Sequence, residues 1–199
     1  MSENKDDIKV DNFIRNAGVD IDGFFEIFSK ETDRGMAIAS VCFLDEILEK
    51  LLRAAYRKDK RIKILFGSNQ ILHSYYNKVH IAYFSGLVPE AIFEDMKIVG
   101  EIRNKFAHFV LDVASFDDEV IVGKINTFKL LPQDYKTLYS PRLLFMLVVV
   151  HMGSLMLGFK EGLSLSKLKT IRFDMDIETL QGLILSPQEI RELKKKQPE

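Results

Sequence analysis

Residues 143–159 form an apolar segment without a single Asp, Glu, Lys or Arg, placed between Arg142 and Lys160. Such a segment must be buried, either in a membrane or in the core of a protein. As a helix rising about 1.5 Å per residue it would span roughly 25 Å, which is short of the hydrocarbon core of a bilayer, about 30 Å thick. It also contains His151, which lowers its apolar density. We therefore expect a buried core helix that opens at Ser140-Pro141, and no membrane partner.

The segment from residue 32 to about residue 57 has the spacing of an amphipathic helix. Thr32 or Asp33 can cap its N-terminus. Glu46 and Lys50 fall four residues apart, where opposite charges pair on a solvated helix face. The apolar positions recur at steps of three and four residues and predict one buried stripe: Ile38, Val41, Leu44, Leu48, Leu51 and Ala55.

Further helices follow from glycine, proline and capping signals. A helix over residues 75–84 can be terminated by Gly86, because glycine adopts the left-handed conformation at little cost. The next helix, over residues 89–108, can begin at a proline whose missing N–H would have no partner there. Residues 120–128 fit a helix, although Val120-Ile121-Val122 could instead form a short strand.

No internal repeat, low-complexity tract or Pro/Gly/Ser-rich linker divides the chain. The polar residues 1–10 predict a flexible lead, and residues 11–199 are then one domain. Within it, one or two short helices are expected over residues 13–28, and a last short basic helix after Ser186. The predicted fold class is all-α, an antiparallel multi-helix bundle in a single domain.

Acidic and basic residues are nearly balanced, with 28 Lys and Arg against 29 Asp and Glu. The chain therefore has no net positive charge that would attract nucleic acid, and any binding site for a polyanion must come from a local group of basic residues. Cys42 is the single cysteine, which excludes an intramolecular disulfide and the Cys-rich zinc patterns. Its apolar neighbours predict a small buried side chain rather than a reactive thiol. The polar N-terminus lacks the apolar stretch of a secretory signal, so we expect a cytoplasmic protein.

The histidines lack the spacing of a metal site, and the chain has no HExxH motif. It also lacks the GxGxxG, GxxxxGK[ST] and GxSxG patterns that bind dinucleotides and nucleotide phosphates or present a nucleophilic serine. We therefore expect neither a metal nor another cofactor. The histidines considered are His73, His80, His108 and His151.

A basic cluster runs from Arg53 to Lys63, interrupted by Asp59 alone among the acidic residues. It could contact phosphates, or it could be a solvated helix end whose cations complement the helix dipole, and the second interpretation is favoured. The apolar residues 62–66 follow directly, where a helix-turn-helix would need a second helix with polar base-reading side chains. Direct, sequence-specific DNA binding is therefore not expected.

The sharpest constellation of polar residues lies within residues 102–108. Asn104 and His108 are four apart, so they share a helix face, and Arg103 lies about 100° round the axis from Asn104. An arginine that holds a phosphate beside a histidine that moves a proton could cleave RNA without a metal. The favoured alternative is structural: Asn104 and His108 make buried hydrogen bonds, and Arg103 pairs with an acid such as Asp45 or Asp112.

Several blocks of the sequence occur in the order seen in the mannitol operon repressor (MtlR) family, and together they cover about residues 28–160. They resemble that family at residues 31–35, 43–46, 65–67, 78–83, 86–88, 102–108 and 116–118. The tail, residues 163–199, lies outside the resemblance.

This resemblance implies an all-helical bacterial protein that regulates transcription of a sugar-alcohol operon. It implies no DNA-reading module, so we expect regulation through a protein partner, with a homodimer left open. A sensor with a small-molecule pocket between helices is a weaker alternative. The residues expected to bind a partner are Asp33, Arg34, Asp45, Lys78, Tyr83, Arg103, Asn104 and His108.

A looser resemblance is to HEPN helical domains, whose Arg-x4–6-His motif is matched by Arg103 and His108. In catalytic HEPN members the motif implies metal-independent ribonuclease action at a dimer interface. Arg103, Asn104 and His108 are then the candidate catalytic residues, and RNA is the alternative partner. A non-enzymatic regulator is favoured, and the ribonuclease or RNA-binding domain is the alternative.

Overall fold

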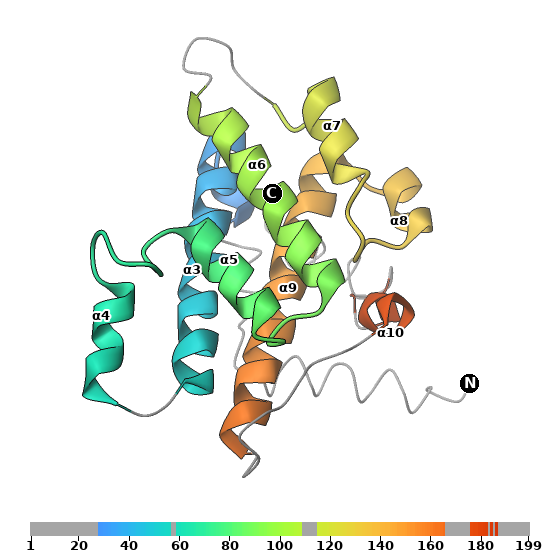
Figure 1. Ribbon diagram of the computed structural model, residues 1–199. Coiled ribbons are helices and arrows are strands. Elements are labelled where there is room, and N and C mark those ends of the chain that lie inside the picture. The colour runs from blue at the N-terminus through green and yellow to red at the C-terminus, as the bar shows by residue number, and fades with distance from the viewer. Residues whose placement is uncertain are drawn as a thin grey trace.

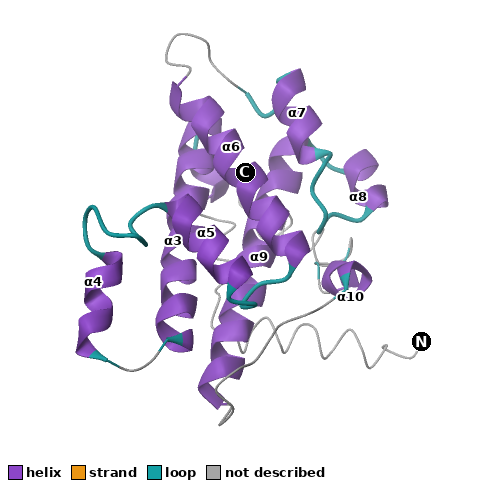
Figure 2. Ribbon diagram, in the orientation of Figure 1, coloured by secondary structure: helices purple, strands orange, loops and turns teal. Residues whose placement is uncertain are grey.

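The computed structural model describes residues 28–56, 59–108, 115–165, 176–182, 184 and 186, and the regular elements within these ranges are all helical (Figure 2). This confirms the predicted all-α helical bundle. In chain order the elements are α3 (Asp33–Ala55), η1 (Lys60–Ile62), α4 (Lys63–Phe66), α5 (Tyr75–Phe84), α6 (Glu90–His108), α7 (Glu119–Ile125), α8 (Gln133–Leu138), α9 (Pro141–Leu165) and α10 (Ile177–Gly182).

Helix α9 is the central element, as the apolar segment predicted. By length and composition residues 141–163 could cross a membrane, but 83% of their most apolar window is buried inside the protein. The helix contacts α3 most extensively, and Figure 1 shows it running behind α5 and α6. Gly153 allows the close approach to α3, because a Cβ at this position would lie 2.5 Å from Cε1 of Phe43.

Helix α3 begins as expected and is buried along one stripe. Of the two candidate caps it is Thr32 that acts, because its side chain accepts a hydrogen bond of 3.0 Å from the N–H of Gly35. The buried stripe lies slightly round the helix from the predicted one, over Met36, Ser40 and Leu44. Two expectations are therefore wrong: Ile38 is 38% exposed, and Cys42 is exposed rather than buried.

Helices α5 and α6 pack against each other and against α3 (Figure 1). The turn between them uses Gly86 at φ 69°, the left-handed conformation expected from the sequence. Gly100 of α6 lets an aromatic ring approach the helix axis, since a Cβ there would lie 2.8 Å from Oη of Tyr76. The neighbouring Tyr75 is buried, and its hydroxyl donates a hydrogen bond of 3.0 Å to the carbonyl of Met96.

Residues 120–128 are not a strand: α7 ends at Ile125, and Asp118 caps it by accepting from the N–H of Val120 at 2.9 Å. The short helices η1, α4, α8 and α10 were not predicted, because elements of three to six residues carry too little periodicity. The helices expected within residues 13–28 and after Ser186 lie outside the described residues, apart from Phe28.

Candidate functional site

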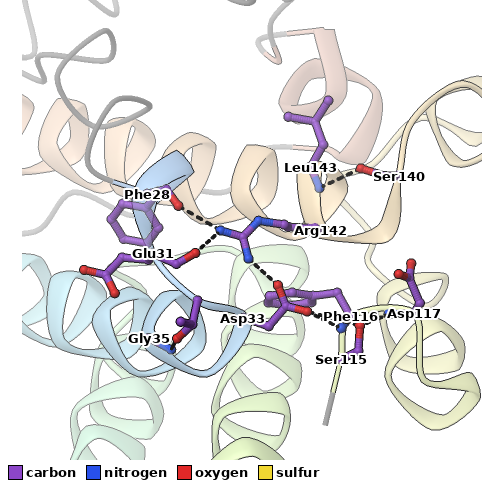
Figure 3. A network of polar contacts seen from close by, with 11 residues as sticks. Phe28, Glu31, Asp33, Gly35, Ser115, Phe116, Asp117, Ser140, Arg142 and Leu143 are labelled. Atoms are coloured by element: carbon purple, nitrogen blue, oxygen red, sulfur yellow. Dashed lines mark hydrogen bonds and ion pairs between the residues drawn. The ribbon is translucent and has the colours of Figure 1, made fainter. Parts of the chain in front are cut away.

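Asp33 holds three segments of the chain together at one end of the bundle (Figure 3). Its Oδ2 accepts hydrogen bonds from the N–H of Phe116 at 3.0 Å and from Oγ of Ser115 at 3.2 Å. Its Oδ1 accepts from the guanidinium of Arg142, at the start of α9. The carboxylate is therefore occupied within the fold, whereas the adjacent Arg34 is exposed.

The same guanidinium group fixes the chain that precedes α3. Arg142 donates to the backbone carbonyl of Phe28 at 3.0 Å and also to that of Glu31 (Figure 3). A planar group with five N–H donors suits this task, because it can reach a carboxylate and two carbonyls at once.

Asp45 and Lys78, both expected to bind a partner, contact each other between α3 and α5. Lys78 is 3% exposed, and its Nζ lies 2.7 Å from Oδ2 of Asp45 and 3.4 Å from Oε2 of Glu49. Glu49 also accepts from Arg53, at 2.8 Å. The second carboxylate oxygen of Asp45 is buried and has no hydrogen-bond partner among the described residues.

Tyr83 belongs to a group of four rings on α5 and α6, which we name the ring cluster: Phe93 is buried, Tyr83 is partly exposed, and His80 and Phe84 are exposed. Tyr83 stacks on Phe93 with ring centroids 4.3 Å apart, and His80 stacks on Phe84 at 6.2 Å. Phe84 is 77% exposed although it is aromatic. Nζ of Lys97 lies over the ring of Phe93, 5.1 Å from its centroid. His80 and Phe84 are four residues apart in the sequence, a spacing that brings side chains together on a helix. The cluster could have been predicted from this spacing but was not.

Arg103 and Asn104 lie where α6 faces Tyr76 of α5. The amide of Asn104 donates to the hydroxyl of Tyr76 at 3.5 Å, a long and weak hydrogen bond. Burial raises the pKa of Tyr76, the charge of Glu101 raises it further, and the charge of Arg103 opposes the rise. Arg103 is partly buried, and no carboxylate in the described ranges pairs with it. The expected pairing with Asp45 is therefore wrong, and Asp112 lies outside these ranges.

His108 is the last residue of α6 and is exposed. The structure brings Arg103 and Asn104 together at Tyr76, but within the described part of the chain no hydrogen bond or ring contact orients the imidazole of His108. A general acid or base must be held within hydrogen-bond reach of the proton it moves. Asn104 and His108 share a face of α6, but the imidazole is not held in place by any contact among the described residues, and the buried hydrogen bond expected for His108 is wrong.

Asp95 is a buried carboxylate that sequence analysis did not select. It is 0% exposed, and it accepts hydrogen bonds from the backbone N–H groups of Lys129 at 2.7 Å and Leu130 at 2.9 Å. Burial raises its pKa to about 7, while these two donors and the charges of Lys129 and Lys136 oppose the rise. In the sequence it stands beside Glu94 and looks like any acid on a helix surface, so no signal identified it.

Among the described residues no group of His, Cys, Asp and Glu side chains could hold a metal ion. Of the predicted basic cluster, Lys60, Arg61 and Lys63 are exposed, whereas Arg57 and Lys58 lie outside the described residues.

Comparisons with known proteins support the fold alone. No protein-family model and no curated protein sequence matches the chain. Its structure is similar to a chain in the X-ray structure of the MtlR-HPr complex from Escherichia coli, with 18% sequence identity and a TM-score of 0.50. The similarity covers 77% of this chain and 99% of that chain. The resemblance to MtlR is therefore one of fold, and the sequence blocks do not establish membership of the family.

Proposed function

We propose that this chain is a bacterial, cytoplasmic regulatory protein that acts by binding a protein partner. More specifically, we propose that the chain resembles the mannitol operon repressor and controls transcription through that partner rather than by reading DNA. The similarity of its fold to a chain crystallised in a complex between two proteins supports the first part.

The observation that carries the proposal is the ring cluster on α5 and α6. Phe84 is 77% exposed, so its apolar ring stays in water and contributes little hydrophobic free energy to the folded chain. Exposed aromatic groups that neighbouring rings hold in place are typical of the residues that dominate binding energy at protein interfaces. Because stacking already restricts His80 and Tyr83, a partner would order few side chains on binding.

The exposed basic residues give less support to DNA reading. Lys60, Arg61 and Lys63 belong to η1 and α4, and α4 extends only over Lys63–Phe66. A helix of one turn is too short to lie along a major groove and present base-reading side chains. Ile64 is also 62% exposed on this helix, which suits a protein contact better than a phosphate contact.

The test is a calorimetric titration of the purified chain with HPr from the same organism. Phe84→Ala should weaken binding at least tenfold, which corresponds to about 1.4 kcal/mol. The matched control is Leu138→Ala on α8, which removes another exposed apolar side chain, 63% exposed, and should leave the affinity unchanged. Absence of HPr binding, combined with tight sequence-specific binding to naked operator DNA, would contradict the proposal.

A further inference from the structure

Three polar side chains on facing surfaces of α5 and α6 have hydrogen-bond donors to spare. They are Tyr76, Arg103 and Asn104, and each is partly exposed. Asn104 and Gly100 are four residues apart, so they share one face of α6, and Tyr76 crosses that face against both. Arg103 is three residues from Gly100 and adjacent to Asn104, so on α6 it flanks the face that Tyr76 crosses. From this arrangement we infer a binding site for a phosphoryl group.

The charges around this site leave one cation without a counterion. Towards α3, Lys78 is neutralised by Asp45 and Glu49, and Glu49 also pairs with Arg53. Towards α7, Glu101 pairs with Lys124. Arg103 alone among these groups has no carboxylate partner in the described parts of the chain. A partly buried positive charge is stabilised when an anion joins it, so the site favours an anionic ligand.

The hydrogen-bond donors at the site are also largely free. The guanidinium of Arg103 has five N–H donors, and in the described residues no acceptor takes any of them. The hydroxyl of Tyr76 accepts from Asn104 at 3.5 Å but donates to no described group. A tyrosine hydroxyl is protonated at neutral pH, and burial and the charge of Glu101 raise the pKa of this one further, so it can act as a donor. The amide of Asn104 can turn to a better acceptor, because its present bond is weak.

The number and kind of donors select a phosphoryl group over a carboxylate. A carboxylate has two oxygens, and one guanidinium satisfies both in the usual bidentate pair. A phosphate monoester has three terminal oxygens and carries about −1.5 to −2 charges at neutral pH. The guanidinium can hold two of these oxygens while the tyrosine hydroxyl and the amide donate to the third. The negative charge of Glu101 acts on Tyr76 and would oppose an anion there, and its pairing with Lys124 reduces this repulsion.

This inference goes beyond the proposed function, because it needs no protein partner. A phosphoryl group could come from a small phosphomonoester or from a phosphorylated side chain, and both present the same three oxygens. The inference is of binding alone and assigns no chemical step to His108, which is exposed at the end of α6.

The test is a titration followed by ¹H–¹⁵N NMR, at constant ionic strength, with inorganic phosphate as the probe. We expect saturable shifts at the side chains of Arg103 and Asn104, and Arg103→Gln should weaken binding at least tenfold. Lys97→Gln is the matched control, since it removes one partly exposed cation from the same helix and should leave the affinity unchanged. Tyr76→Phe, which keeps the ring against Gly100, should weaken binding several-fold even if Arg103→Gln perturbs folding.

Two further ligands identify the source of the phosphoryl group: glycerol phosphate and a phosphoserine peptide. Binding of either, with the same dependence on Arg103, supports the site and shows which kind of molecule reaches it. If inorganic phosphate gives no saturable shift, or if Arg103→Gln and Lys97→Gln behave alike, the inference is overturned. No protein partner is present, so that result would leave the partner-binding proposal untouched.

Discussion

Nζ of Lys78 lies 2.7 Å from Oδ2 of Asp45, so a buried cation on α5 is neutralised by a carboxylate on α3. Sequence analysis had selected both residues for a binding surface, and the structure places them against each other. The lysine side chain is 4% exposed, whereas those of Asp45 and Glu49 are 32% and 33% exposed. The side chains of the two acids are therefore partly open to water whereas the ammonium group is not, and the pair joins α3 to α5.

Replacing Lys78 by Met should destabilise the fold. The substitution keeps a long apolar side chain but leaves two carboxylates without their shared cation. Because both carboxylates are about one-third exposed, the expected loss is about 1–3 kcal/mol, less than for a fully buried pair. Denaturant unfolding measures it. The control, Lys50→Met, breaks an exposed pair with Glu46 and should cost less than about 1 kcal/mol. Equal losses in the two variants would show that the buried pair has no special role.

Two glycines in helices should respond to alanine in opposite directions. At Gly153 the new Cβ would lie 2.5 Å from Phe43, so Gly153→Ala should force α3 and α9 apart and cost about 1–3 kcal/mol. At Gly123, on α7, nothing lies within 4 Å, so Gly123→Ala should stabilise the protein by about 0.5–1 kcal/mol through helix propensity. Thermal unfolding of both variants measures the two changes in stability. A stabilising Gly153→Ala would contradict the prediction of a close contact between α3 and α9.

The long helices could be predicted from the sequence because their apolar spacing persists over several turns. The stripe from Val41 to Leu51 and the uncharged segment after Arg142 are both buried as expected. The periodicity could not fix the edge of the stripe, and for that reason Ile38 and Cys42 were misplaced. Which of two adjacent apolar positions faces the core depends on the crossing of α3 with α9, which is a tertiary property.

The candidate site was predicted less well, because the spacing of residues along one helix does not show which residues of another helix they contact. Arg103 and Asn104 were found through their helical periodicity, but Tyr76, which they face, lies on α5 and was not selected. Asp33 was selected for its place in a motif, whereas its ion pair is with Arg142, which lies 109 positions away in the sequence. Asp95 was missed for the same reason, since its partners lie 34 and 35 positions away.

Purified protein should not cleave single-stranded RNA in a manner that depends on His108. The imidazole is exposed at the end of α6, and in the described residues no contact fixes its orientation towards Arg103. An unoriented base contributes little to proton transfer. The assay compares the protein with His108→Ala on the same RNA in EDTA. Cleavage by the wild type that His108→Ala abolishes would contradict this expectation and favour the ribonuclease alternative.

Asp95 should make stability fall as the pH rises from about 4 to about 7. Burial raises its pKa in the folded protein to about 7, against about 3.9 in an unfolded chain. Between these values the folded state keeps a proton that the unfolded state releases, so rising pH favours unfolding, by an amount on the order of 2–4 kcal/mol. Above pH 7 the contribution no longer changes.

Asp95→Asn isolates this contribution, because it removes the titration and retains the shape of the side chain. Its amide nitrogen replaces one of the two acceptors, so the N–H of Lys129 or Leu130 loses its partner at every pH. That loss is independent of pH, whereas the wild type loses stability only as Asp95 ionises. The difference in unfolding free energy between wild type and variant, measured by urea titration at pH 4.5, 6 and 7.5, should therefore shrink as the pH rises. A constant difference across this range would mean that the carboxylate does not titrate there, and that its two backbone donors outweigh the effect of burial.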